Sequence, residues 1–411
     1  MRKLLYIDSS YTWEQIQQRG LNHVLAIRAL DGYFDQIWSA HPVDTHPASG
    51  IKCRSFGKPL FEAVAFNHAF VRGRYGQFSF LRFIAPLNAV LALGNFLFTL
   101  IGIARREQIK CVRVGDPLLC GLLGIIVAKL CGGKLVVRIN ADNDMIRAST
   151  KSAIMPKFFQ SAAIENYVES FVLKRADRVI VPSEQYAAFA RRKGTAPDRI
   201  AQVRYGNLID PVHLVEPKRR PALEDKNLIL RLSERPWMVH IGRLAKLKHA
   251  GDCVEVLQHL AMHHSNVGLC LVGDGPLRGD MVAKIHAAGL NDRVLLLGNV
   301  DQTTLSRLLP LCTVVISPLT GRALSEAAFA GLPIVAYDLD WQRDIVETGV
   351  TGALVKAQDT RAMADAVGEL LASPQNRKLM GAAARKRAFD ILAPDEQTLR
   401  EIDVYKSLGI A

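Results

Sequence analysis

A strand–turn–helix–strand pattern between Val315 and Asp338 constrains the fold of this chain more than any other stretch. We predict an apolar strand at 313–316, a polar turn with Gly321, a helix of small residues at 323–330 and a second strand at 334–337. Such a unit belongs to a parallel sheet, and its turn lies where helix N–H groups can bind an anion. Glu326, one turn inside the helix, would oppose a phosphate but could accept hydrogen bonds from a ribose. The pattern favours a nucleotide site, although it also occurs in α/β proteins that bind nothing.

Three more predicted strands of the second half, at 237–241, 267–272 and 294–297, also run into glycine turns. Because the carboxyl ends of parallel strands meet at one edge of a sheet, we expect all these turns to lie together. The first half also alternates strands and helices, which predicts a second doubly wound sheet. Its expected strands are 4–7, 34–39, 51–56, 63–67, 111–114, 134–139, 176–183 and 199–203, with helices expected at 13–30 and 162–175. The 411 residues have room for two such domains.

Cysteine usage and the N-terminus indicate a cytoplasmic protein. Seven cysteines are scattered without a C-x-x-C pair, which fits reduced thiols better than a disulfide framework or a zinc site. The apolar run Leu4–Ile7 ends at Asp8, and a signal peptide needs a longer one.

Charge is unevenly distributed along the chain. Residues 1–210 carry 28 Lys and Arg against 16 Asp and Glu, and the remainder carries 24 against 23. A basic face can bind nucleic acid, an anionic membrane or an anionic substrate, or can simply keep the protein soluble. The segment Phe83–Ala104 has no charge and is flanked by Arg82 and by Arg105 with Arg106. It is long enough to span a bilayer, but its Pro, Gly and Asn residues favour a buried or surface-lying helix.

The second half also resembles a known family. The motifs are G-R-L-x-x-x-K from Gly242, V-G-D-G-P from Val272, L-G-x-V from Leu297, S-P…G…E-A from Ser317 and T-G-A-L-V from Thr351. In this order they resemble the donor domain of the retaining glycosyltransferases of family four. The resemblance implies the GT-B fold, an α/β fold of two Rossmann-like doubly wound domains that face a cleft, with a C-terminal helix crossing back to the first domain. It implies an acceptor domain at 1–212, a linker at 213–235, a donor domain at 236–390 and the returning helix at 391–411.

The resemblance also assigns roles to residues. It implies that Arg243 and Lys248 are the catalytic cations on the donor diphosphate and that Glu326 binds the ribose. Other matching donor-site positions are Gly242, Gly273, Asp274, Gly298, Asn299, Val300, Ser317, Gly321, Arg322, Ala323 and Leu324. One position departs from the family pattern, because Pro318 stands where a glutamate usually contacts the donor sugar.

The acceptor side is less well marked. We assign it to Ser9, Ser10, Asn140 and Asp142, which follow predicted strands of the first half. Asn and Asp after a strand equally fit a helix cap.

These observations lead to one expected activity. Two fixed cations can stabilise the charge that develops on a leaving diphosphate, so no metal and no cofactor are expected. We expect a retaining glycosyltransferase that uses a nucleoside-diphosphate sugar, UDP rather than GDP, and does not bind nucleic acid. The basic first half predicts a peripheral enzyme on the anionic inner face of the plasma membrane, with a lipid-linked or other membrane-held glycan acceptor in surface polysaccharide synthesis.

Two alternatives stay open. One is a sugar-nucleotide epimerase of the GT-B fold, and the other is a non-catalytic nucleotide-binding scaffold, which Pro318 keeps in consideration. A dehydrogenase is disfavoured because Arg278 stands where the third glycine of a dinucleotide-binding motif belongs.

Overall fold

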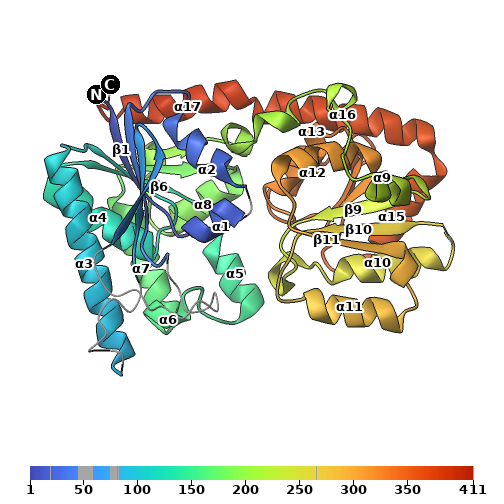
Figure 1. Ribbon diagram of the computed structural model, residues 1–411, viewed down its shortest axis with the longest axis horizontal. Helices are drawn as coiled ribbons and strands as arrows, with labels where there is room; N and C mark the ends of the chain where they lie inside the picture. The colour runs from blue at the N-terminus through green and yellow to red at the C-terminus, as the bar shows by residue number, and fades with distance from the viewer. Residues whose placement is uncertain (19, 45–58, 75–80, 82, 265, 411) are drawn as a thin grey trace. The chain divides into compact units, whose positions relative to one another are not determined.

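The computed structural model describes residues 1–18, 20–44, 59–74, 81, 83–264 and 266–410. The chain divides into two compact units (Figure 1): unit 1 is Met1–Arg204 with the segment from Glu396, and unit 2 is Tyr205–Asp395. Each unit contains its own sheet with helices on both faces, so the predicted fold of two doubly wound domains is confirmed.

Unit 1 is built on an eight-stranded sheet of order β3-β4-β2-β1-β5-β6-β7-β8. Its strands are β1 Lys3–Ile7, β2 Gln36–His41, β3 Leu60–Ala65, β4 His68–Arg72, β5 Cys111–Val114, β6 Lys134–Arg138, β7 Arg178–Val181 and β8 Ile200–Gln202. All pairs are parallel except β3 with β4, which form a hairpin. The strand predicted at 63–67 was confirmed only over 63–65, which belong to β3, because Phe66 and Asn67 form the turn of this hairpin; β4 was not predicted. The strand expected at 51–56 lies outside the described residues.

The helices of unit 1 connect and cover these strands. They are α1 Trp13–Gln18, α2 Asn22–Ala26, α3 Ala85–Arg106, α4 Leu119–Cys131, α5 Asn143–Thr150, α6 Pro156–Phe159, α7 Ala162–Arg175, α8 Glu184–Arg192 and α17 Pro394–Lys406. The single helix predicted at 13–30 was wrong. Gly20 takes a φ of 61° between α1 and α2, a conformation that interrupts a right-handed helix.

Both faces of the unit 1 sheet are buried, as β1 shows. Leu5 and Ile7 pack into a core with residues of α3, α4 and α7, whereas Leu4 and Tyr6 pack into a second core with residues of α17. Successive side chains of a strand point to opposite faces, so β1 serves both layers.

Unit 2 is built on a six-stranded parallel sheet of order β11-β10-β9-β12-β13-β14. Its strands are β9 Trp237–Ile241, β10 Gly268–Val272, β11 Val294–Gly298, β12 Val314–Ser317, β13 Ile334–Tyr337 and β14 Gly352–Val355. Its helices are α9 Lys226–Ser233, α10 Asp252–Ala261, α11 Arg278–Ala287, α12 Gln302–Leu308, α13 Ala323–Phe329, α14 Gln342–Ile345, α15 Thr360–Ala372 and α16 Pro374–Leu392. The segment predicted as a linker at 213–235 contains α9 and belongs to unit 2, where Leu232 is part of the core.

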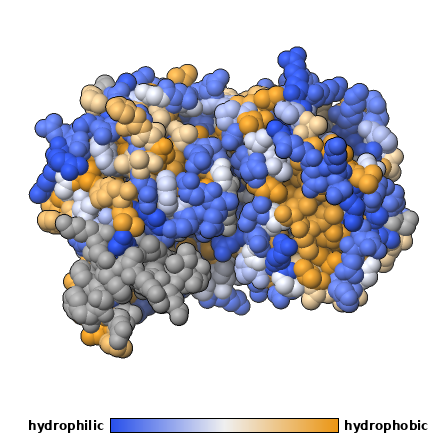
Figure 2. All heavy atoms as spheres, in the orientation of Figure 1, coloured by the Kyte–Doolittle hydropathy of each residue, from blue (hydrophilic) through white to orange (hydrophobic). Residues whose placement is uncertain are grey.

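Helix α3 is only half covered by unit 1. Phe96, Leu100 and Ile103 are buried in the core, and the helix packs beside α4 along the outer side of the unit (Figure 1). Its other face exposes apolar side chains, some of which are visible at the lower left of Figure 2, where α3 begins. Together with the residues just before the helix, these side chains form the α3 ridge: Phe83, Ile84, Leu87, Val90, Leu91 and Phe98. Among the described helices, α3 is the one that is long and apolar enough to cross a membrane, by length and composition.

A buried carboxylate holds α17 on unit 1. Glu401 has no exposed surface and pairs with Arg113 of β5 and with Arg138 of β6, whose Nη1 lies 2.8 Å from Glu401 Oε2. The Tyr405 hydroxyl donates a further hydrogen bond to Glu401 over 3.1 Å. One helix therefore supplies the counter-charge for two arginines inside the sheet.

We predict that Glu401→Gln destabilises unit 1 strongly, because two buried guanidinium groups lose their counter-charge. Breaking a buried ion pair costs about 3–5 kcal/mol, whereas an exposed pair contributes about 1 kcal/mol or less. Glu396→Gln on the same helix is the matched control, since Glu396 forms an exposed pair with Arg400. Urea denaturation measures both; equal effects of the two changes would contradict this role of Glu401.

Candidate functional site

Three glycine turns at the carboxyl edge of the unit 2 sheet pack directly on one another. Gly242, Gly273 and Gly298 follow or end β9, β10 and β11, which are neighbours in the sheet. The Gly273 N–H donates to the Gly298 carbonyl over 2.7 Å, and a Cβ at Gly273 would lie 2.0 Å from the Gly242 carbonyl oxygen. Gly273 has a φ of 133°. Only glycine allows this approach, so the three turns form one continuous backbone surface.

Lys248 lies against the fourth turn of the same edge. Its Nζ is 3.1 Å from the position that a Cβ would take at Gly321, which has a φ of 69°. Burial lowers the pKa of Lys248, and the carboxylate of Asp340 opposes this effect. The sequence placed Lys248 and Gly321 at one site, and the structure brings them together. Arg243, the other predicted cation, is exposed next to Gly242.

The loop after β12 is held by a buried amide. The Ser317 hydroxyl lies 2.7 Å from the Thr320 hydroxyl and donates to Gln342 Oε1. Gln342 Nε2 in turn donates to the carbonyls of Pro318, over 3.1 Å, and of Tyr337, over 2.9 Å. Gln342 has no exposed surface, so it ties the loop after β12 rigidly to the loop after β13.

Glu326 lies in the first turn of α13 and is 6% exposed. Burial lowers the pKa of His213, and the negative charge of Glu326 opposes that effect, so the two side chains interact electrostatically. His213 Nε2 lies 2.6 Å from Gln302 Oε1, so a polar group from α12 also borders this region.

The other predicted donor-site residues differ in exposure. Asn299 and Asp274 are exposed, and Val300 packs partly against the core. Arg322 and Ala323 are half-buried. Leu324 is fully buried, and its N–H donates to the Gly321 carbonyl over 3.1 Å. Leu324 therefore contributes to the core and to the helix start.

Two polar side chains of this edge were missed by the sequence analysis. His240 is buried in β9, its Nδ1 lies 3.3 Å from the Ile316 carbonyl oxygen, and its Nε2 is buried without a hydrogen-bond partner. Burial lowers the pKa of His240 to about 4, so the imidazole is neutral at pH 7. Asp340 follows β13 and interacts with Lys248. The sequence places His240 within a predicted strand and Asp340 just after one. Their approach to Lys248 depends on the order of β9, β12 and β13 in the sheet.

On unit 1, the loop after β1 contains the predicted acceptor residues Ser9 and Ser10. The Ser9 hydroxyl donates to Asp116 over 3.1 Å, and the Ser10 hydroxyl donates to Asp8 over 2.6 Å. Asp8 also forms a buried ion pair with Arg28 over 2.8 Å. The carboxyl edge of the unit 1 sheet therefore carries Asp8, Asp116 and Arg28, to which the sequence assigned no role.

Asn140 and Asp142, the other predicted acceptor residues, follow β6. Asn140 is exposed, and its amide lies 3.4 Å from the Gly115 carbonyl oxygen. Asp142 caps α5 by accepting from the N–H groups of Asp144 and Met145, and it pairs with Arg192 over 2.8 Å. The contacts of Asp142 are those of a helix cap.

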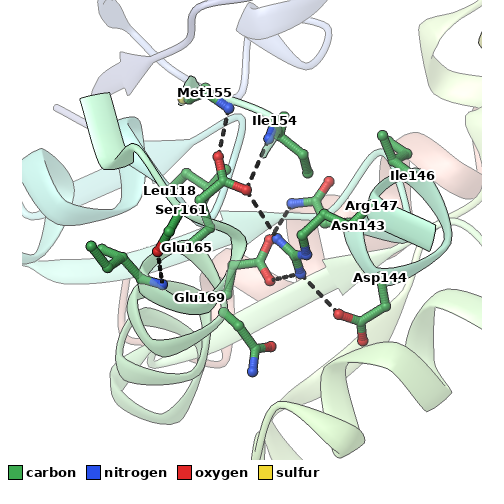
Figure 3. Close-up of polar contacts among 12 residues, drawn as sticks. Leu118, Asn143, Asp144, Ile146, Arg147, Ile154, Met155, Ser161, Glu165 and Glu169 are labelled. Atoms are coloured by element: carbon green, nitrogen blue, oxygen red, sulfur yellow. Dashed lines mark hydrogen bonds and ion pairs between the residues drawn. The ribbon is translucent and has the colours of Figure 1, made fainter. Parts of the chain in front are cut away.

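A buried ion network holds α5, which follows the loop after β6, and the segment behind it in the chain. Figure 3 shows Arg147 of α5 between two carboxylates of α7, Glu165 and Glu169, both without exposed surface. Glu165 also accepts from the backbone N–H groups of Ile154, over 2.9 Å, and Met155, over 2.5 Å. Buried carboxylates require such partners. These two carboxylates therefore fix the position of α5 and of the backbone at Ile154 and Met155. Among the described residues, no group of three or more His, Cys, Asp or Glu side chains could hold a metal ion.

Comparison with known proteins agrees with this architecture. Residues 37–206 match the model of the glycosyl transferase 4-like domain, and residues 224–387 match that of the glycosyl transferases group 1. The structure of Anabaena HepE in complex with UDP and glucose superposes with a TM-score of 0.71 over 98% of this chain and 100% of that chain, at 16% identity.

Two curated enzymes are similar in sequence. The α-D-kanosaminyltransferase of Streptomyces kanamyceticus is 26% identical over 69% of this chain and 73% of its own length. The GDP-mannose-dependent α-(1-6)-phosphatidylinositol monomannoside mannosyltransferase of Mycobacterium tuberculosis is 29% identical over 38% of this chain and 43% of its own length. With both family models matched in order and the fold confirmed, the chain belongs to the family-four type of glycosyltransferases with the GT-B fold.

Proposed function

We propose that this glycosyltransferase transfers a sugar from a UDP-sugar, with retention of configuration and without a metal, to a membrane-held acceptor. The observation that carries the donor half of the proposal is the position of Lys248 Nζ beside the Gly321 turn. A cation there can meet the negative charge that develops on the diphosphate as the glycosidic bond breaks. Arg243 supplies a second cation whose planar fork can bind two phosphate oxygens.

The donor assignment also draws on the similar proteins. HepE is described in complex with UDP and glucose, whereas the mannosyltransferase depends on GDP-mannose. We favour UDP, with Glu326 accepting hydrogen bonds from the ribose hydroxyls and the turn at Gly298, Asn299 and Val300 beside the base. The family resemblance supports retention of configuration. The two available cations support metal independence, because they can neutralise the leaving diphosphate.

The acceptor half of the proposal rests on the α3 ridge. Phe83 is 82% exposed and Phe98 is 76% exposed, and apolar side chains of this size gain by insertion into a lipid interface. Arg105 and Arg106 are exposed at the end of the helix, where they can contact anionic lipid headgroups. Arg72 does not contribute, because it is buried among Asp44, Glu14 and Glu62. We therefore propose a cytoplasmic, peripheral enzyme that acts on a lipid-linked glycan in surface polysaccharide synthesis.

We predict that Lys248→Ala lowers turnover roughly a hundredfold or more, the effect of removing one group that stabilises a developing anion. Lys246→Ala is the matched control, since Lys246 is exposed in the same turn. Release of UDP from UDP-sugars measures both. Full activity of Lys248→Ala would contradict the assignment.

We predict that Glu326→Ala weakens nucleotide binding roughly tenfold or more, because a hydrogen bond to a charged group contributes about 1.5–3 kcal/mol. Calorimetric titration with UDP and GDP measures the affinities, with Glu369→Ala, an exposed position on α15, as the control. Unchanged affinity for both nucleotides would place the ribose elsewhere.

We predict binding to anionic liposomes that salt weakens, measured by flotation. Replacing Val90 and Phe98 with Ser should reduce it through lost apolar insertion, and replacing Arg105 and Arg106 with Glu should reduce it through repulsion. Leu230→Ser on α9 is the control, since Leu230 is 64% exposed on unit 2. Absence of binding at low salt, or equal loss in the control, would show that the α3 ridge does not meet a membrane.

A further inference from the structure

The loop after β12 presents no carboxylate to the donor sugar. The family pattern has a glutamate at this position, whereas Pro318 has an apolar ring and a carbonyl that accepts from Gln342 Nε2 over 3.1 Å. A sugar has hydroxyl groups along its ring, and a binding site needs acceptors for them. Another side chain must therefore serve this role if the enzyme binds a sugar here.

The neighbouring loop lies close enough to supply it. Strands β12 and β13 are paired, with Ser317 opposite Ala336, so the loops that follow them are adjacent. Gln342 joins the two loops through its hydrogen bonds to the carbonyls of Pro318 and Tyr337. Asp340 is the carboxylate in the middle of the second loop.

Asp340 is held in an unusual backbone conformation. Its φ is 55°, in the left-handed region that glycine adopts most easily. The next residue, Trp341, is 4% exposed and packs its ring 5.2 Å from that of Tyr205, and Gln342 is fully buried. The loop is thus fixed on its C-terminal side, and Asp340 keeps a conformation in which its carboxylate interacts with Lys248.

The proposed role of Lys248 as a diphosphate ligand indicates which part of a nucleotide sugar lies near Asp340. In a nucleotide sugar the sugar is attached to the second phosphate, so a group beside a lysine that binds this phosphate is within reach of the sugar. An ionised carboxylate can accept hydrogen bonds from two adjacent hydroxyls at once.

We propose that Asp340 binds the hydroxyl groups of the donor sugar, replacing the carboxylate that is absent at Pro318. This inference rests on the proposed function, because it takes Lys248 as the diphosphate ligand. Asp340 then determines how strongly the sugar, as distinct from the nucleotide, is held.

The test compares the affinity for UDP with the use of UDP-sugars. The variants are Asp340→Asn, which keeps the shape of the side chain, and Asp340→Gly, which suits the left-handed backbone. The matched control is Asp338→Asn, because Asp338 is an exposed carboxylate of the same loop that pairs with Arg343 over 2.8 Å. UDP affinity is measured by calorimetry. kcat/KM is measured as UDP release from whichever of UDP-glucose, UDP-galactose and UDP-N-acetylglucosamine the wild-type enzyme uses best.

We expect both Asp340 variants to bind UDP within about twofold of the wild type and to lose roughly tenfold or more in kcat/KM, the effect of one lost charge-assisted hydrogen bond. Asp338→Asn should change neither value. Unchanged kcat/KM in both Asp340 variants would overturn the proposal. An equal loss of UDP affinity and kcat/KM would also overturn it, since Asp340 would then act on Lys248 or the loop. A wild-type enzyme that binds no UDP or uses none of the three sugars would instead contradict the proposed function itself.

Discussion

The carboxyl edge of the unit 2 sheet depends on the contact between the backbones of Gly242 and Gly273. A methyl group at Gly273 would overlap the Gly242 carbonyl oxygen, so this contact exists only because Gly273 has no side chain. It lets the turns after β9, β10 and β11 form one surface, and it fixes the start of the segment that ends at Lys248. The turn after β9, which leads to Lys248, lies between the turns after β10 and β12, and the Lys248 ammonium lies beside Gly321 of the turn after β12.

Unit 1 is organised by buried charge. Arg28, Arg72, Arg113 and Arg138 are all buried, and each has at least one carboxylate partner. Their carboxylate partners neutralise these four charges, so the positive excess of the first half comes from its other Lys and Arg residues. The α3 ridge and the exposed Arg105 and Arg106 at the end of its helix are the features on which the proposed membrane contact rests.

The sequence predicted the fold class and the glycine turns at the carboxyl edge of the unit 2 sheet because both depend on local signals. Apolar strands that run into glycine turns, as at Gly242 and Gly321, can be recognised without knowing which distant residues they contact.

The errors arose where long-range contacts decide the structure. The β3–β4 hairpin adds an edge strand with a weak pattern to the sheet, and α9 is stabilised by the core of unit 2 through Leu232. Asp340 could not be assigned because its approach to Lys248 is set by strand order. Asp142 shows the opposite case, in which a polar residue at the expected edge makes the contacts of a helix cap.

Unit 1 is discontinuous in the sequence, since its last helix follows the whole of unit 2. During translation the sheet of unit 1 leaves the ribosome first, but Arg113 and Arg138 lack their partner until Glu401, 263 positions after Arg138, has been made. At about 5–20 residues per second, this interval lasts roughly 13–53 s. Unit 2 is contiguous and can complete its core within that time. The sheet of unit 1 can therefore gain its last helix only after unit 2 has been synthesised.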